Sequence, residues 1–81
     1  MYYVYVLKSQ KNGKRYTGYT QKLPKIRLKE HNQGSNTWTR QNGPFDLLYS
    51  EKHSSRHAAI KRETYMKSAA GRKFLDKVLR S

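Results

Sequence analysis

The chain has 81 residues, enough for one small domain and too few for a second hydrophobic core. Lys and Arg number 18 against 5 Asp and Glu, which gives a formal net charge of +13. Because seven Tyr accompany this charge, we expect a folded domain rather than a disordered basic tail. Its partner should be a polyanion, namely nucleic acid, an anionic membrane surface or an acidic protein.

Several protein classes are excluded by composition. The chain has no cysteine, so it has neither a disulfide scaffold nor a thiolate metal site. Its longest apolar run, residues 2–7, is too short to cross a membrane. No signal peptide is visible at the start, so we expect a single domain over residues 1–81 in the cytoplasm.

The N-terminal residues predict a β-hairpin. Residues 2–7 are apolar or aromatic on both alternating faces, which is typical of a central strand covered on both sides. Asn12 and Gly13 predict a two-residue type I′ turn before a second strand at residues 15–19. In this register Tyr16 pairs with Ser9, and Tyr5 faces the same side as Tyr16.

The rest of the chain predicts helices around one further strand. Residues 23–33 form the first predicted helix, with Gly34 just past its end. We expect a polar loop at residues 34–43, a strand at 45–51, and two helices, from Ser54 or Ser55 to Ser68 and over residues 72–79. The order β-β-α-β-α-α defines an α+β domain, a three-stranded sheet with helices packed against it.

The acidic residues limit any metal site. None of the five is a close sequence neighbour of another: Glu30, Asp46, Glu51, Glu63 and Asp76. A divalent cation would therefore be held by one or two carboxylates, with water and phosphate oxygens completing its shell. Glu63 shares a predicted helix face with apolar Ala59 and Met66. Spacing alone favours the plainer interpretation of Glu63, an i,i+4 ion pair with Lys67.

Four other side chains are candidates for chemistry. Tyr5 and Tyr16 can look into the same space, where Gly18 leaves room, although tyrosines of a small domain can also be core. Arg27 and His31 lie four apart on the first helix, so one could clamp a phosphate while the other moves a proton. By spacing alone, Arg and His on a helix are more commonly just solvated.

Together these positions resemble a known family. Tyr-Val-Tyr at residues 3–5 and Tyr-Thr-Gly at residues 16–18 resemble the two-part signature of GIY-YIG nuclease domains. Arg27, His31 and Glu63 follow in the order of that family's other functional positions. The resemblance covers nearly the whole chain, and segments such as residues 28–32 and 71–75 look like the small stand-alone bacterial members.

The resemblance implies a fold and a reaction. The fold would be a three-stranded antiparallel sheet flanked by helices, with a single Mg²⁺ (or Mn²⁺) on Glu63. The reaction would be metal-assisted hydrolysis of phosphodiester bonds in DNA, in repair or recombination. Carried over, Tyr16 would help to activate water with Tyr5 beside it, and Arg27 would steady the phosphate. His31 would orient water or relay a proton.

The sequence also departs from the family pattern. Thr17 stands where a bulky aliphatic residue is usual, Tyr3 stands where Gly is common, and no Asn follows Glu63. Lys67 or Arg72 could replace the phosphate contact of that Asn. A separate protein could supply target choice, which relatives obtain from a second domain. Six residues are candidates for contacting nucleic acid: Tyr19, Trp38, Arg40, Lys67, Arg72 and Lys73.

Three functions are compatible with these features. The first is a small metal-dependent endonuclease, with DNA favoured over RNA. The second is a nucleic-acid-binding module whose residual site is silent, with Trp38 and Arg40 stacking on bases or contacting the backbone. The third is a basic subunit of a larger protein assembly. No membrane partner is expected.

Overall fold

The computed structural model describes residues 1–34 and 37–80. Its elements are β1 (Tyr2–Ser9), β2 (Arg15–Thr20), α1 (Pro24–Asn32), α2 (Thr37–Asn42), β3 (Phe45–His53), α3 (Arg56–Lys67) and α4 (Ala69–Arg80). The strands form one antiparallel sheet in the order β2-β1-β3, which confirms both the expected fold class and the central place of the first strand. Within the described ranges, no helix has the length and apolar character needed to cross a membrane.

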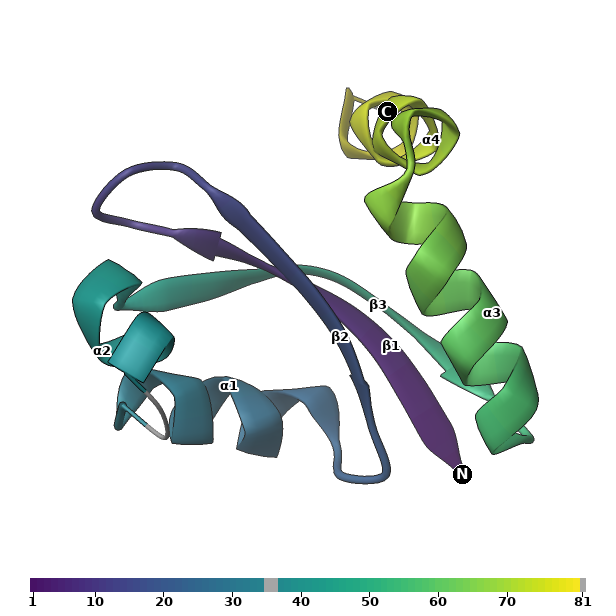
Figure 1. Ribbon diagram of the computed structural model, residues 1–81, viewed down its shortest axis with the longest axis horizontal. Helices are drawn as coiled ribbons and strands as arrows, with labels where there is room; N and C mark the ends of the chain where they lie inside the picture. Colours follow the sequence, from purple (N-terminus) through teal and green to yellow (C-terminus); the bar gives the residue numbers. More distant parts are fainter. Residues whose placement is uncertain (35–36, 81) are drawn as a thin grey trace.

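Helices cover both faces of the sheet. Figure 1 shows α1 and α2 on one side and α3 and α4 on the other. Val4 and Val6 of β1 are buried with Ala59, Met66 and Leu75 of α3 and α4. The alternating residues of β1 point the other way and pack with the start of β3 beside α1. This two-sided burial explains why the first strand is apolar on both faces.

The hairpin differs from its predicted register. Tyr16 pairs with Leu7 instead of Ser9, and residues 10–14 connect the strands, so the two-residue type I′ turn was wrong. The Oγ of Ser9 accepts hydrogen bonds from the backbone N–H groups of Lys11 and Asn12, while the Ser9 carbonyl accepts from Gly13, whose φ is +74°. These bonds stabilise a longer turn than the Asn-Gly pair alone suggests. The shift is an even number of residues, so every side chain keeps its predicted face.

Part of the predicted polar loop after α1 is helical. Gly34, at φ +77°, follows the end of α1 as predicted, and its N–H donates to the carbonyl of His31. The predicted polar loop is wrong over Thr37–Asn42, because these residues form α2. This helix carries Trp38 and Arg40; residues 35–36 of the predicted loop lie outside the described part of the chain.

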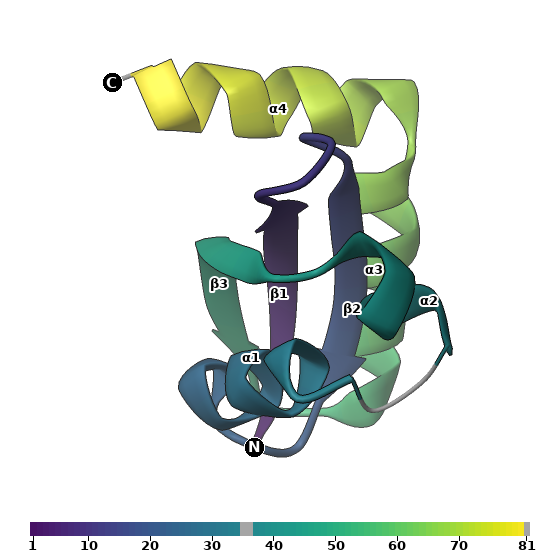
Figure 2. The same cartoon turned by 90° about the vertical axis from the view of Figure 1, so that its left-hand side faces the viewer.

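The C-terminal helices follow one another closely. Ser55 caps α3 by accepting a hydrogen bond from the N–H of Ala58, which confirms one of the two predicted caps. Ser68 ends α3 in an extended conformation and caps α4, since its Oγ accepts from the N–H of Gly71. The last helix therefore begins at Ala69, earlier than predicted. Figure 2 shows α4 lying across the hairpin end of the sheet.

Candidate active site

The ring of Tyr5 lies across β2 at Gly18, its partner in the sheet. A Cβ at Gly18 would lie 2.6 Å from the Tyr5 hydroxyl oxygen and 2.8 Å from Cζ. No other residue type leaves this space, so the predicted room beside the tyrosines is confirmed. Tyr5 is only 1% exposed, and the glycine is what allows so large a side chain to fold down against the neighbouring strand.

Three aromatic rings meet at this position. The hydroxyl of Tyr5 lies 3.1 Å from Nε2 of His31, which is fully buried. The ring of Tyr16 lies 4.9 Å from the His31 ring and 6.3 Å from the Tyr5 ring, measured between centroids. Tyr16 is half-buried and lies on the β2 edge of the sheet, so it connects the buried pair with the surface.

Arg27 completes the cluster from α1. Its guanidinium lies beside the Tyr5 hydroxyl and also donates to Glu30 across 3.0 Å. Glu30 is shared with Lys22, 2.5 Å away, and hydrogen bonds from Lys22 and Arg27 lower its pKa. The carboxylate of Glu30 thus helps to hold the side chain of Arg27 beside the tyrosine.

The protonation states follow from burial. Burial raises the pKa of Tyr5 to about 12 in spite of the nearby Arg27 charge, so the phenol keeps its proton at neutral pH. Burial, followed by the charge of Arg27, lowers the pKa of His31, so the imidazole is neutral there. The Tyr5 hydroxyl and Nε2 share one hydrogen bond, in which the imidazole tautomer decides which of the two donates. In the described part of the chain, Nδ1 is buried without a hydrogen-bond partner.

Two residues that sequence reasoning missed hold this cluster in place. The side chain of Asn32 donates to the carbonyl of Phe45 across 3.2 Å and accepts from its N–H across 2.7 Å, so it joins the end of α1 to the start of β3. Phe45 in turn stacks on Trp38 at 5.6 Å between centroids, and Trp38 lies 5.2 Å from Tyr16. No helical or strand periodicity marks an Asn that pairs with a distant backbone.

Glu63 lies on the other side of the sheet from Tyr5 and His31, because α3 packs against the opposite face. Its carboxylate lies 3.8 Å from Nζ of Lys67, which confirms the i,i+4 ion pair, and its side chain is 18% exposed. The structure therefore brings four of the five predicted catalytic residues together. The fifth is separated from them by the edge strand β2, around which Lys67 and Tyr16 line a common hollow.

The candidate nucleic-acid contacts are dispersed. Lys67 and Arg72 line the hollow beside Tyr16, whereas Lys73 is exposed on α4. Tyr19 packs on the α3 face of the sheet and lines a separate hollow with Arg56.

The two candidates on α2 take different places. Trp38 is 38% exposed and forms part of the aromatic wall described above. The stem of Arg40 covers Gly34, where a Cβ would lie 2.1 Å from its Cγ. Trp38 therefore contacts the cluster through the ring of Tyr16.

The acidic side chains suit only one kind of cation site, in which a single carboxylate is the protein ligand. Across the described residues, no three His, Asp or Glu side chains gather around a common point. Glu63 is a half-buried carboxylate with one lysine partner, and Mg²⁺ accepts such a single ligand when water and substrate phosphate fill its shell. The donor set thus fits an open, substrate-completed site and does not fit a closed protein cage.

The fold and this cluster define a class of protein. The family model described as the GIY-YIG catalytic domain matches residues 1–75. The chain therefore belongs to the GIY-YIG family, a family of nucleases that generally use a divalent metal.

Its relatives are small proteins of similar size. The UPF0213 protein CPE1444 of Clostridium perfringens is 44% identical over 68 residues, which cover 83% of this chain and 71% of that protein. The UPF0213 protein SSP2268 of Staphylococcus saprophyticus is 35% identical over 74 residues, which cover 91% of this chain and 89% of that protein. The solution structure of the UPF0213 protein BH0048 from Bacillus halodurans matches this structure with a TM-score of 0.58 at 33% sequence identity. The match covers 96% of this chain and 85% of that chain. These matches confirm the resemblance to small stand-alone bacterial members.

Proposed function

We propose that this protein is a divalent-metal-dependent endonuclease that hydrolyses phosphodiester bonds in DNA. One observation carries the proposal: Tyr5, Tyr16, Arg27 and His31 form a single cluster in a domain of net charge +13. The chain's membership of a nuclease family supports the same reaction class.

Each member of the cluster has a role that suits its environment. Tyr16, at the edge of the cluster, orients the attacking water. The attacking water gives its proton to the oxygen of Tyr16, and Tyr16 gives its phenolic proton to the oxygen of Tyr5. Tyr5 in turn gives its phenolic proton to Nε2 of His31. The neutral state of His31 is the state that such an acceptor requires. Arg27, held by Glu30, binds the phosphate as negative charge increases on its oxygens.

Glu63 is the proposed metal ligand, in agreement with the open donor set. When bound, Mg²⁺ or Mn²⁺ would polarise the phosphate and stabilise the leaving oxygen. A substrate phosphate that reaches both Tyr16 and Glu63 must lie across the edge of β2, where both faces of the sheet are accessible. Such a phosphate would complete the cation's shell in a way that protein ligands alone do not.

A nicking assay tests this function. Supercoiled plasmid and branched DNA are incubated with the protein and Mg²⁺ or Mn²⁺, and cleavage is followed on gels. The Glu63→Gln variant keeps the size of the side chain and removes its charge, so cleavage should fall by roughly 10²-fold or more while the folded state is retained. The exposed Asp46→Asn exchange on β3 is the matched control. Equal cutting by Glu63→Gln and wild type would refute the assignment.

A second function is favoured by the position of Glu63. Its carboxylate contacts Lys67 and lies on the face opposite the tyrosine cluster. A basic module that binds nucleic acid without cutting it would have such a site. In that case neither metal supports nicking, yet DNA binding weakens steeply with salt because bound counterions are released.

A further inference from the structure

A basic hollow lies beside the active site. It encloses about 660 Å³ between the β1–β2 hairpin, β2 and the α3–α4 junction. Its lining residues are Gly13, Lys14, Arg15, Tyr16, Thr17, Lys67 and Arg72. All of them carry polar or positively charged side chains or none at all, and no aliphatic side chain takes part. Because Lys14, Arg15, Lys67 and Arg72 are cationic, the hollow favours an anionic ligand.

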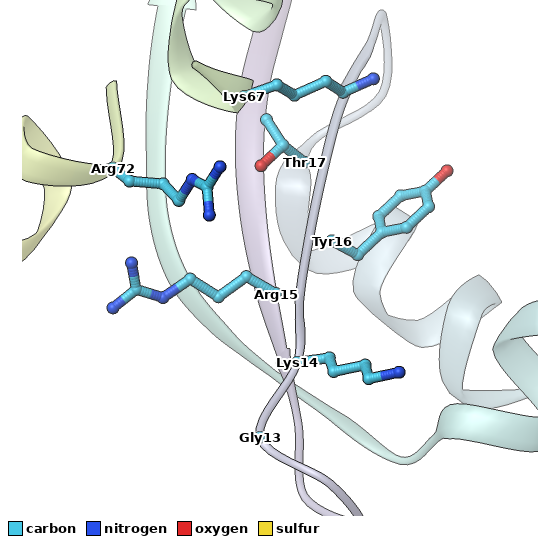
Figure 3. Close-up of a pocket in the computed structure, with 7 residues that line it drawn as sticks. All are labelled: Gly13, Lys14, Arg15, Tyr16, Thr17, Lys67 and Arg72. Carbon is cyan, nitrogen blue, oxygen red and sulfur yellow. The ribbon is translucent and has the colours of Figure 1, made fainter. Parts of the chain in front are cut away.

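Two arginines from different elements line this hollow. Figure 3 shows Arg15 of β2 and Arg72 of α4 extending from opposite sides into the space between these elements, with the hydroxyl of Thr17 near the guanidinium of Arg72. Positive charges gathered in one hollow repel one another while it is empty, and an anion that enters relieves this repulsion. Planar guanidinium groups bind phosphate oxygens in pairs, which suits them to the phosphates of a nucleic-acid backbone.

The charges of this site are only partly neutralised. Arg15 is held by Asp76 at 2.7 Å, and Lys67 is paired with Glu63 at 3.8 Å. Within residues 1–34 and 37–80, no ion-pair partner is found for Lys14 or Arg72. Arg15 is therefore fixed in orientation, while two further cations are available for a ligand.

The hollow is continuous with the tyrosine cluster through Tyr16. Figure 3 shows this ring directed to the side of β2 away from Arg15 and Arg72. We propose that the hollow binds the phosphates of the substrate strand that follow directly on the cleaved phosphate. This inference rests on the proposed nuclease function and deepens it, because it assigns Lys14, Arg15, Thr17 and Arg72 to a backbone track over the edge of β2.

Binding measured without catalysis tests this track. A short fluorescent DNA duplex is titrated with protein in EDTA at several KCl concentrations, and anisotropy gives the dissociation constant. The Lys14→Gln/Arg72→Gln variant should weaken binding by roughly tenfold or more and reduce the slope of log K against log salt by about 2. The Lys52→Gln/Lys61→Gln variant, exposed residues outside the hollow, removes the same charge and should change both quantities much less.

The outcomes separate the inference from the function on which it rests. Equal losses in the two double variants would show that affinity comes from diffuse surface charge, and an unchanged affinity in both, or no binding by the wild type, would equally overturn the track. Competition by inorganic phosphate at concentrations far below those expected from ionic strength would point to a free-phosphate site instead, and would also overturn it. Failure of the wild type to cut DNA with Mg²⁺ affects the proposed function alone, because the binding comparison in EDTA does not depend on cleavage.

Discussion

The Tyr5 hydroxyl and Nε2 of His31 lie 3.1 Å apart, although the residues are separated by 26 positions in the chain. The contact joins the central strand to α1 and is buried from solvent. Because burial raises the pKa of Tyr5 and lowers that of His31, the donor and the acceptor are both uncharged at neutral pH. The resting pair is therefore neutral, which avoids placing an unpaired charge in the buried site.

Replacing Tyr5 by Phe should separate chemistry from packing. The ring remains against Gly18, but the hydrogen bond to His31 is lost, so the free energy of unfolding should fall by about 1 kcal/mol. Cleavage should fall by roughly 10²-fold or more, because the proton path is broken. Plasmid nicking and urea unfolding measure the two effects.

The matched control is Tyr49→Phe, which removes a hydroxyl that donates to Glu51 at 2.8 Å on β3. It should lower stability to a similar extent and leave cleavage unchanged. If both variants cut DNA like the wild type, Tyr5 has only a packing role.

Adding one methyl group at Gly18 should damage the site. In Gly18→Ala the new Cβ collides with the Tyr5 ring, and the expected loss of stability is about 1–3 kcal/mol. The Tyr5→Leu exchange removes the colliding atoms, so the double variant should be more stable than the sum of the two single losses allows. Chemical denaturation of the four proteins gives this coupling, and strictly additive losses would contradict the contact.

The free energy of unfolding should decrease as the pH is lowered, because of His31. The folded-state pKa of His31 is lowered, so the unfolded chain binds the proton more readily once pH drops below about 6.5. Below that value the free energy of unfolding should decrease by up to about 1.4 kcal/mol per pH unit, until the folded protein is protonated too. The His31→Gln variant should lose this contribution to the slope. Urea titrations across the range test it, and identical slopes for the two proteins would contradict the prediction.

Removing the Asn32 side chain should destabilise the packing of α1 on β3, although Asn32 is not a member of the tyrosine cluster. Asn32→Ala leaves the N–H and carbonyl of Phe45 without their partner, which should cost about 1–3 kcal/mol. Since His31 and Arg27 lie on the same helix, cleavage should fall as well. Gln33→Ala, at the exposed next position, should have little effect on either quantity. Equal behaviour of the two variants would show that the clamp is unimportant.

Alternation of side chains was the most reliable guide from the sequence. It placed the first strand in the centre of the sheet and put Tyr5 and Tyr16 on one face. That result survived an incorrect turn, because pairing Tyr16 with Leu7 instead of Ser9 leaves every side chain facing the same way. The helical spacing of Arg27 and His31 was equally sufficient to bring both to the cluster.

Other features could not be read from local spacing. The longer turn depends on Ser9 accepting backbone hydrogen bonds, and α2 depends on Trp38 packing on Phe45. Helical phase placed Glu63 beside Ala59 and Met66, but it carries no information on which face of the sheet the helix will cover. That choice is made by tertiary packing, so the separation of Glu63 from the tyrosines appears only in three dimensions.

The position of β2 as an edge strand has a consequence for how a bound polymer can be detected. The outward amides of an edge strand exchange their hydrogens with solvent, since no neighbouring strand protects them. A nucleic acid that extends from Tyr16 to Arg72 would cover this exposed edge of the sheet. Binding should then slow deuterium uptake along Arg15–Thr20, whereas the outer border formed by β3 should exchange as before.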